Sequence, residues 1–175
     1  GAVTGAKGLG SVVAETGKEV QAFAFYGSAK RGASMTAYNR IDEEEIIDHG
    51  KFMHPDYVFM LDPALVFTDD FTANETEDTK YIITTHLNKA ELVEMVPALQ
   101  GREDRTFILD CLTISQETIG RPIPNTPMLG AFMKVSGMFE LDYFQNAMKS
   151  VLKKLPQKVI DANMIAIERA YNEVH

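Results

Sequence analysis

The stretch KYIITTHLNKAELVEMVPALQGREDRTFILDCL, residues 80–112, decides the fold class of this chain. Residues 80–85 and 106–112 are apolar runs typical of strands, and residues 89–98 have the composition of a helix. Asn88 precedes this helix in the position of an N-cap. A strand, a helix and a second strand in this order favour two parallel strands joined by a crossover helix.

The same alternation extends toward the amino terminus. Residues 19–26 and 33–41 are predicted strands joined by a glycine-containing loop. Residues 57–61 form a short apolar strand that ends at Pro63, because proline cannot donate to a ladder and restricts the residue before it. Residues 68–79 are polar and acidic, which predicts an exposed loop or a short hairpin.

The first residues suggest that the sheet continues beyond this sequence. Residues 2–16 predict a helix that is rich in small residues and has no strand before it. A domain of alternating strands and helices that opens on such a helix is expected to have its first strand missing from the chain.

Helices dominate the last third of the chain. Residues 113–120 are helical in pattern and lead into the stiff linker Arg121-Pro122-Ile123-Pro124. Asn125 or Thr126 can cap the next helix, which Gly137 ends, and residues 141–152 and 157–171 predict two more. We therefore expect a single α/β domain over residues 1–175, with three layers and a mainly parallel sheet flanked by helices.

Composition excludes several classes of protein. The net charge of −8 argues against a nucleic-acid partner, because a phosphate backbone needs a basic face. No run of about 18 apolar residues is present, so no membrane span is expected, and no signal peptide is visible. The single cysteine, Cys111, is expected in the buried strand at residues 106–112, which agrees with a reduced, cytoplasmic setting.

No complete catalytic set stands out in the sequence. The carboxylates at residues 42–45 and 69–70 lie in predicted loops and are typical of solvated charge. No Gly-Lys-Ser or Gly-Lys-Thr tripeptide is present, which excludes a phosphate-binding P-loop. The histidines have no metal-ligand spacing and no obvious nucleophile beside them; they are His49, His54, His86 and His175. We expect a domain without its own active site that works within a larger assembly.

Two segments have the composition of a binding site. Residues 25–33, FYGSAKRGA, lie between two predicted strands, where glycines let backbone amides approach a phosphate or a partner chain. Arg31 can bind an anion in a bidentate manner. Residues 124–132, PNTPMLGAF, place a capped helix start beside small residues, which suits an anion or close packing. A plain connecting loop and a plain core helix are the alternatives.

Five short segments together carry a family resemblance. They are GAVTGA at residues 1–6, QAFAFYGSAKRGA at 21–33, PDYVFMLDP at 55–63, NTPMLGAF at 125–132 and NMIAIERAY at 163–171. In this order they resemble the signatures of the gamma subunit of thiamine-dependent 2-oxoacid:ferredoxin oxidoreductases. Gly1 matches the last glycine of the opening Arg-Gly-x-Gly-Gly-Gln-Gly-Val motif, most of which is absent. Ala29 stands where a glutamate is usual, and Ala170 where a glycine is usual.

The resemblance implies a part in the oxidative decarboxylation of a 2-oxo acid to an acyl-CoA, with electrons passed through iron–sulfur clusters to ferredoxin or a similar acceptor. Thiamine diphosphate with Mg²⁺ and the clusters would lie in the complex with alpha, beta and delta-type subunits. This chain would hold no cofactor alone and would help to assemble the complex and enclose coenzyme A. The residues then expected at the cofactor site are Gly1, Tyr26, Gly27, Arg31, Gly32, Asn125 and Thr126.

Two other functions fit the same pattern. The strand–helix alternation and the glycine-rich start also suit a stand-alone, doubly wound nucleotide- or flavin-binding module. A structural adaptor without any ligand contact is the third possibility. The 2-oxo acid and the electron acceptor are not predicted by this sequence.

Overall fold

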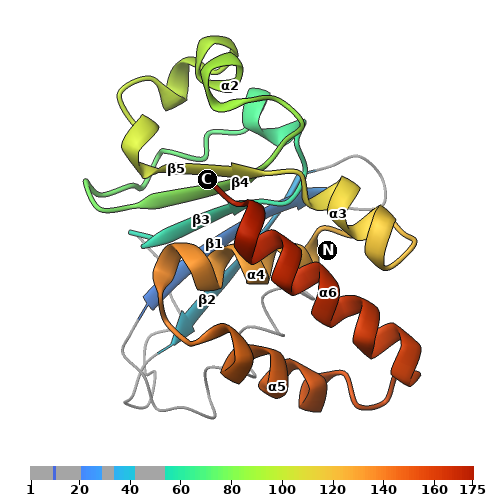
Figure 1. Cartoon of the computed structure of the whole chain (residues 1–175). Coiled ribbons are helices and arrows are strands. Elements are labelled where there is room, and N and C mark those ends of the chain that lie inside the picture. The colour runs from blue at the N-terminus through green and yellow to red at the C-terminus, as the bar shows by residue number, and fades with distance from the viewer. Residues whose placement is uncertain (1–9, 11–20, 29–33, 42–53) are drawn as a thin grey trace.

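The computed structural model describes Gly10, residues 21–28 and 34–41, and residues 54–175. Four parallel strands form the body of one sheet, and a fifth strand pairs with its edge in the antiparallel direction (Figure 1). The strand order is β2-β1-β3-β4-β5. The strands are β1 Gln21–Ser28, β2 Ser34–Ile41, β3 Tyr57–Met60, β4 Lys80–Thr84 and β5 Thr106–Leu109. The mainly parallel sheet is confirmed.

The central strands are covered on both faces, which explains their continuous apolar sequences. All four residues of β3 are buried. Because successive side chains of a strand point to opposite faces, Tyr57 and Phe59 pack into one core and Val58 and Met60 into the other. The alternating pattern of a half-exposed strand is therefore absent from β3.

Helices lie on both sides of the sheet, so the three-layer architecture is confirmed (Figure 1). One core contains residues of α3, α4, α5 and α6, and the other contains Leu92 of α2 and the 3-10 turn Pro97–Leu99. The helices are α2 Lys89–Met95, α3 Cys111–Thr118, α4 Asn125–Ser136, α5 Leu141–Val151 and α6 Gln157–Glu173. In the described part of the chain, no helix has the length and apolar character needed to cross a bilayer.

Helices α4 and α6 pack against each other at very close range. Phe132 of α4 meets the rings of Tyr57 and Phe59 edge-on, with centroid distances of 4.9 and 5.3 Å, which anchors α4 to the sheet. On its other side, α4 presents Gly130 to the backbone of Ile167 in α6. A Cβ atom at Gly130 would lie 2.3 Å from the carbonyl oxygen of Ile167, so this glycine permits the contact.

Several helix boundaries follow from local chemistry, as predicted. Asn88 accepts a hydrogen bond from the backbone N–H of Glu91, and the Glu91 side chain accepts one in return from the N–H of Asn88. Gly137 ends α4 with a φ of 61°, in the left-handed region that favours glycine.

Other predicted boundaries are wrong. The last strand ends at Leu109, and Cys111 is the first residue of α3 instead of a strand residue, although it is buried as expected. Asp110 causes this change, because its side chain accepts a hydrogen bond from the N–H of Thr113 and caps the helix. The helix predicted over residues 89–98 ends at Met95, since Pro97 cannot continue it.

The segment at residues 68–79 is only in part the exposed loop that its polar sequence predicts. Phe71 is buried against Tyr81, with the ring centroids 5.6 Å apart. Glu75 accepts hydrogen bonds from the Tyr81 hydroxyl and from Arg102, whose Nε lies 2.8 Å from Oε1. Arg105 donates to the carbonyl oxygens of residues 76 and 79, at 3.0 and 2.8 Å. This cluster attaches the loop to β4 and β5.

Predictions for the start of the chain concern residues that the structure does not describe. The helix over residues 2–16 lies among them, apart from Gly10, which is in a helical conformation. The expectation that a first strand is missing concerns the same undescribed start of the chain. The structure also does not describe three of the residues predicted at the cofactor site: Gly1, Arg31 and Gly32.

Candidate functional site

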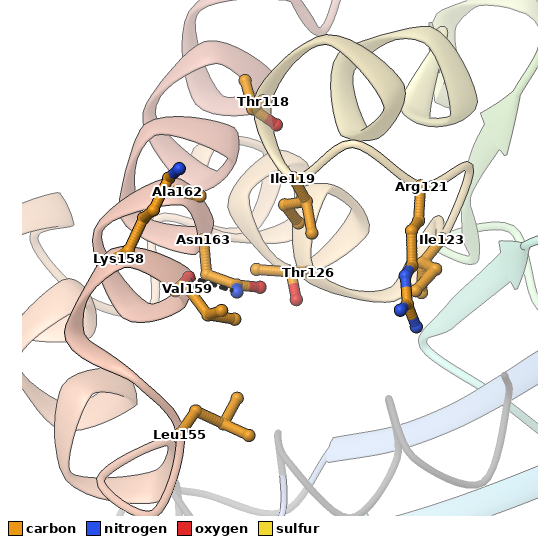
Figure 2. Close-up of a pocket in the computed structure, with 10 residues that line it drawn as sticks. All are labelled: Thr118, Ile119, Arg121, Ile123, Thr126, Leu155, Lys158, Val159, Ala162 and Asn163. Carbon is orange, nitrogen blue, oxygen red and sulfur yellow. Dashed lines mark hydrogen bonds between the residues drawn. The ribbon is translucent and has the colours of Figure 1, made fainter.

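A pocket of about 500 Å³ opens between α3, α4 and α6. It brings together the end of α3, the proline-containing linker, the first turn of α4 and the first half of α6 (Figure 2). The walls are formed by Thr118, Ile119, Arg121, Ile123, Thr126, Leu155, Lys158, Val159, Ala162 and Asn163. The segments at residues 125–132 and 163–171, which are far apart in the sequence, therefore meet at this pocket.

One buried hydroxyl fixes the linker that forms a wall of the pocket. Ser115 is fully buried in α3 and donates a hydrogen bond to the carbonyl oxygen of Arg121 at 2.6 Å. Its Oγ also accepts a hydrogen bond from the N–H of Ile123 at 3.2 Å. Gly120 reverses the chain before the linker with a φ of 83°, which favours glycine. The backbone that carries Arg121 and Ile123 is thus held in place by side-chain chemistry.

The floor of the pocket is polar. Asn163 is only 6% exposed, and its Nδ2 donates to the carbonyl oxygen of Val159 at 2.7 Å. Its carboxamide points toward Thr126 across the pocket (Figure 2). A carboxamide and a hydroxyl can both donate and accept hydrogen bonds, so the floor can bind polar groups of either kind.

The charge of the pocket is opposite to that of the whole chain. Arg121 and Lys158 lie on opposite sides of it (Figure 2), and none of the lining residues that the structure describes is acidic. Among the described residues, neither cation forms an ion pair. With a net charge of −8 for the chain, this local excess of positive charge makes the pocket suited to an anionic group.

The start of α4 differs from its predicted capped form. The N-cap position belongs to Pro124, and no side chain caps the helix, so Asn125 and Thr126 are already inside it. The Oδ1 atom of Asn125 is buried, and no hydrogen-bond partner lies within its reach among the described residues. A buried acceptor without a partner costs about 1–3 kcal/mol. Thr126 lines the pocket, whereas Asn125 lies beside the residues that line it.

The described residues at the end of β1 do not line this pocket. The carbonyl oxygen of Tyr26 accepts a hydrogen bond from the N–H of Leu61 at 2.8 Å, which fixes the strand end, and Gly27 is buried. The Tyr26 side chain packs with Val58 and Met60, on the face of the sheet opposite to α4. The Tyr26 ring therefore lies on the face opposite to α4 and does not line the pocket between α3, α4 and α6.

Cys111 has no features of a catalytic nucleophile. The side chain is fully buried, and burial raises the pKa of its thiol above the ordinary value. Among the described residues, no three His, Cys, Asp or Glu side chains gather in a way that could hold a metal ion.

We expect Cys111 to react with a thiol reagent at least about a hundredfold more slowly in the native chain than in urea, because labelling requires opening of the core. Labelling kinetics with a chromogenic disulfide measure this ratio, and equal rates in both states would contradict a buried thiol.

Three residues of the pocket were not predicted at a site from the sequence: Arg121, Lys158 and Asn163. A local signal existed for the last two, because residues 155, 158, 159, 162 and 163 recur at the spacing of one helical face. No local signal places Arg121 beside them, since the linker joins this face only through the packing of α3, α4 and α6.

Known proteins are similar to this chain in both sequence and fold. A family model described as pyruvate ferredoxin/flavodoxin oxidoreductase matches residues 1–173. The pyruvate/ketoisovalerate oxidoreductases common subunit gamma of Pyrococcus abyssi is 38% identical over 170 residues, which cover 97% of this chain and 90% of that protein. The pyruvate synthase subunit PorC of Thermotoga maritima is 35% identical over 175 residues, covering 99% of this chain and 88% of the relative.

Two solved structures resemble this chain. The pyruvate oxidoreductase subunit PORC of Thermotoga maritima has a TM-score of 0.78 and 32% identity, and the match covers 100% of this chain and 90% of that one. The gamma subunit of a keto/oxoacid ferredoxin oxidoreductase from Geobacter sulfurreducens has a TM-score of 0.68 at 16% identity, with 99% of this chain and 89% of that chain covered. The second likeness supports the fold alone.

Proposed function

Because the chain belongs to the pyruvate ferredoxin/flavodoxin oxidoreductase family, we propose that it is the gamma-type subunit of a multi-subunit 2-oxoacid oxidoreductase. The complex oxidatively decarboxylates a 2-oxo acid to an acyl-CoA and passes the electrons to ferredoxin or a similar acceptor. The observation that carries this proposal is the 38% identity to a named gamma subunit, which extends over 97% of this chain.

In this proposal, thiamine diphosphate, Mg²⁺ and the iron–sulfur clusters lie on partner subunits of alpha, beta and delta type. The described residues of this chain provide a packed scaffold and one mixed pocket, and their single cysteine is buried in the core. A stand-alone nucleotide- or flavin-binding module is not favoured, because the relatives that match nearly the whole chain are named as subunits.

Co-expression with the other subunits of the same organism tests this assignment. We expect the chain to purify in a stoichiometric complex that reduces a viologen dye only when a 2-oxo acid and coenzyme A are both present. Preparations that lack this chain should have lost most of the activity. A chain that purifies alone from cells expressing every subunit, with a nucleotide or flavin bound, would support the alternative module.

We place the contact with coenzyme A at the carboxyl edge of the sheet, after β1. Tyr26 and Gly27 belong to the last residues of β1, which ends at Ser28, and Arg31 and Gly32 follow in the sequence. Loops at the carboxyl ends of parallel strands are the usual place for a ligand crevice. Backbone amides at these glycines and the guanidinium group suit the phosphates of coenzyme A. The sequence adds Gly1 to this set. Asn125 and Thr126, which the sequence also predicts at the cofactor site, belong to the start of α4, and Thr126 lines the pocket between α3, α4 and α6 instead.

Replacing Arg31 with alanine should raise the KM for coenzyme A roughly tenfold, since one charge-assisted contact with a phosphate contributes on the order of 1.5–3 kcal/mol. The KM for the 2-oxo acid should change much less. Steady-state kinetics of the assembled complex measure both constants, and Lys30→Ala serves as the neighbouring control. Coenzyme A kinetics that stay unchanged in Arg31→Ala would remove this residue from the site and favour a purely structural adaptor.

A further inference from the structure

We propose that the pocket between α3, α4 and α6 is a docking site for an acidic segment of another subunit in the same complex. The segment would bring a carboxylate to Arg121 and place apolar side chains on the rim of the pocket. This inference rests on the proposed function, because it requires a partner subunit, and it concerns a pocket whose described lining includes no residue of β1.

Charge complementarity is the first argument. The described lining of the pocket carries two cations and no acidic residue, on a chain whose net charge is −8. Both Arg121 and Lys158 are exposed, and neither has an ionic partner among the described residues. A basic recess on an acidic surface attracts an acidic partner and repels surfaces that resemble the rest of this chain.

The rim supplies the second argument. Ile123 and Leu155 are 39% and 43% exposed, and they lie on opposite sides of the pocket, with Ile123 beside Arg121 (Figure 2). Ile119 and Val159 continue the apolar surface inward. Apolar side chains around a charged contact exclude water from it when a partner binds, which strengthens the contact. A free phosphate or other small anion would leave these apolar side chains in water.

The rigid construction of the pocket is the third argument. Ser115 holds the backbone on both sides of Pro122 through its hydrogen bonds to Arg121 and Ile123. The buried Asn163 is fixed at one end by Val159, and its carboxamide faces the pocket together with Thr126. An extended peptide has backbone N–H and C=O groups that such side chains can bind. A pre-formed site loses less conformational entropy on binding.

Photo-cross-linking in the complete complex tests the identity of the occupant. A photoreactive phenylalanine at Leu155 should cross-link to a peptide of another subunit that contains Asp or Glu beside an apolar residue. The same group at Met95, which is 57% exposed and belongs to α2 on the other face of the sheet, serves as the control. Mass spectrometry identifies the peptide. No cross-link to a partner subunit from position 155, or a link to a basic segment, would overturn the proposal.

Charge reversal provides the second measurement. Arg121→Glu combined with Lys158→Glu should weaken binding of this subunit to the rest of the complex about tenfold or more, as expected for the loss of a close charge pair across an interface. The matched control reverses Lys153 and Lys154, which are exposed and do not line the pocket. Binding is measured by titrating labelled subunit into complex that lacks it, and circular dichroism checks that both double variants are folded.

The outcomes separate this inference from the proposed function. Loss of affinity only in the pocket variant supports docking. Equal affinity of wild type and pocket variant overturns it, as does a raised KM for coenzyme A with unchanged subunit affinity, which would make the pocket a ligand site. Failure of the wild-type chain to bind the other subunits overturns the proposed function itself, before any variant is compared.

Discussion

Replacing Gly130 with alanine is expected to lower the free energy of unfolding by about 3 kcal/mol or more, the upper range for overpacking a tight core. The added Cβ would lie 2.3 Å from the carbonyl oxygen of Ile167 and 2.9 Å from its Cα. Both neighbours are backbone atoms of α6, so no side-chain rotation can relieve the clash. The two helices must separate, which disturbs the hydrophobic core to which both contribute buried residues.

The sign of this effect distinguishes packing from helix propensity. Alanine in a helix interior is favoured over glycine by about 1 kcal/mol, so propensity alone predicts a more stable variant. Gly120→Ala is the matched control, because Gly120 has a φ of 83° and open space around it. That variant should lose only about 1–2 kcal/mol through backbone strain. Urea unfolding of both variants gives the comparison, and a Gly130→Ala chain as stable as wild type would contradict the close contact.

Replacing Glu75 with glutamine should lower the free energy of unfolding by about 2 kcal/mol, in the range for hydrogen bonds to charged groups. Its carboxylate binds Arg102 through two nitrogen atoms and also accepts from Tyr81, while its side chain is only 18% exposed. Glutamine keeps the shape but has no charge, which leaves the two neighbouring arginines without a counter-ion in a partly buried position. Glu77→Gln, exposed on the same loop, is the control and should change stability little.

Because of the Glu75 carboxylate, we expect the free energy of unfolding to depend on pH. Hydrogen bonds from Arg102 are the main cause that holds the pKa of Glu75 below its ordinary value of 4.5. A carboxyl group with a lower pKa in the folded state contributes stability that is present above pH 4.5 and is lost as the pH falls through the folded-state pKa. The difference in unfolding free energy between wild type and Glu75→Gln should therefore shrink below pH 4.5. A difference that stays constant in acid would show that the charge contributes nothing.

The sequence predicted the fold well where the signal is local. The apolar runs at β3, β4 and β5 and the helix after Asn88 predict an α/β domain, because strand and helix periodicities depend on neighbouring residues. Boundaries were predicted less well. The last strand ends three residues earlier than residues 106–112 suggest, because the capping bond of Asp110 competes with the strand for the following backbone.

The sequence also identified the family, but it did not predict the role that each signature segment has in the structure. The fourth and fifth segments, at residues 125–132 and 163–171, meet in space for two separate reasons. Gly130 permits close packing against Ile167, whereas Thr126 and Asn163 line the pocket. A linear pattern gives both kinds of residue the same weight, and only their contacts distinguish a packing role from a binding role.

The sequence by itself therefore determined the fold class and the family, since both depend on residue types and their local spacing. Tertiary structure alone decided that Tyr26 and α4 lie on opposite faces of the sheet, that Glu75 is enclosed by arginines, and that Arg121 faces α6 across a pocket. The physical reason is that these positions depend on how helices and loops pack on the sheet. Such packing joins residues that are tens of positions apart, and no local periodicity records it.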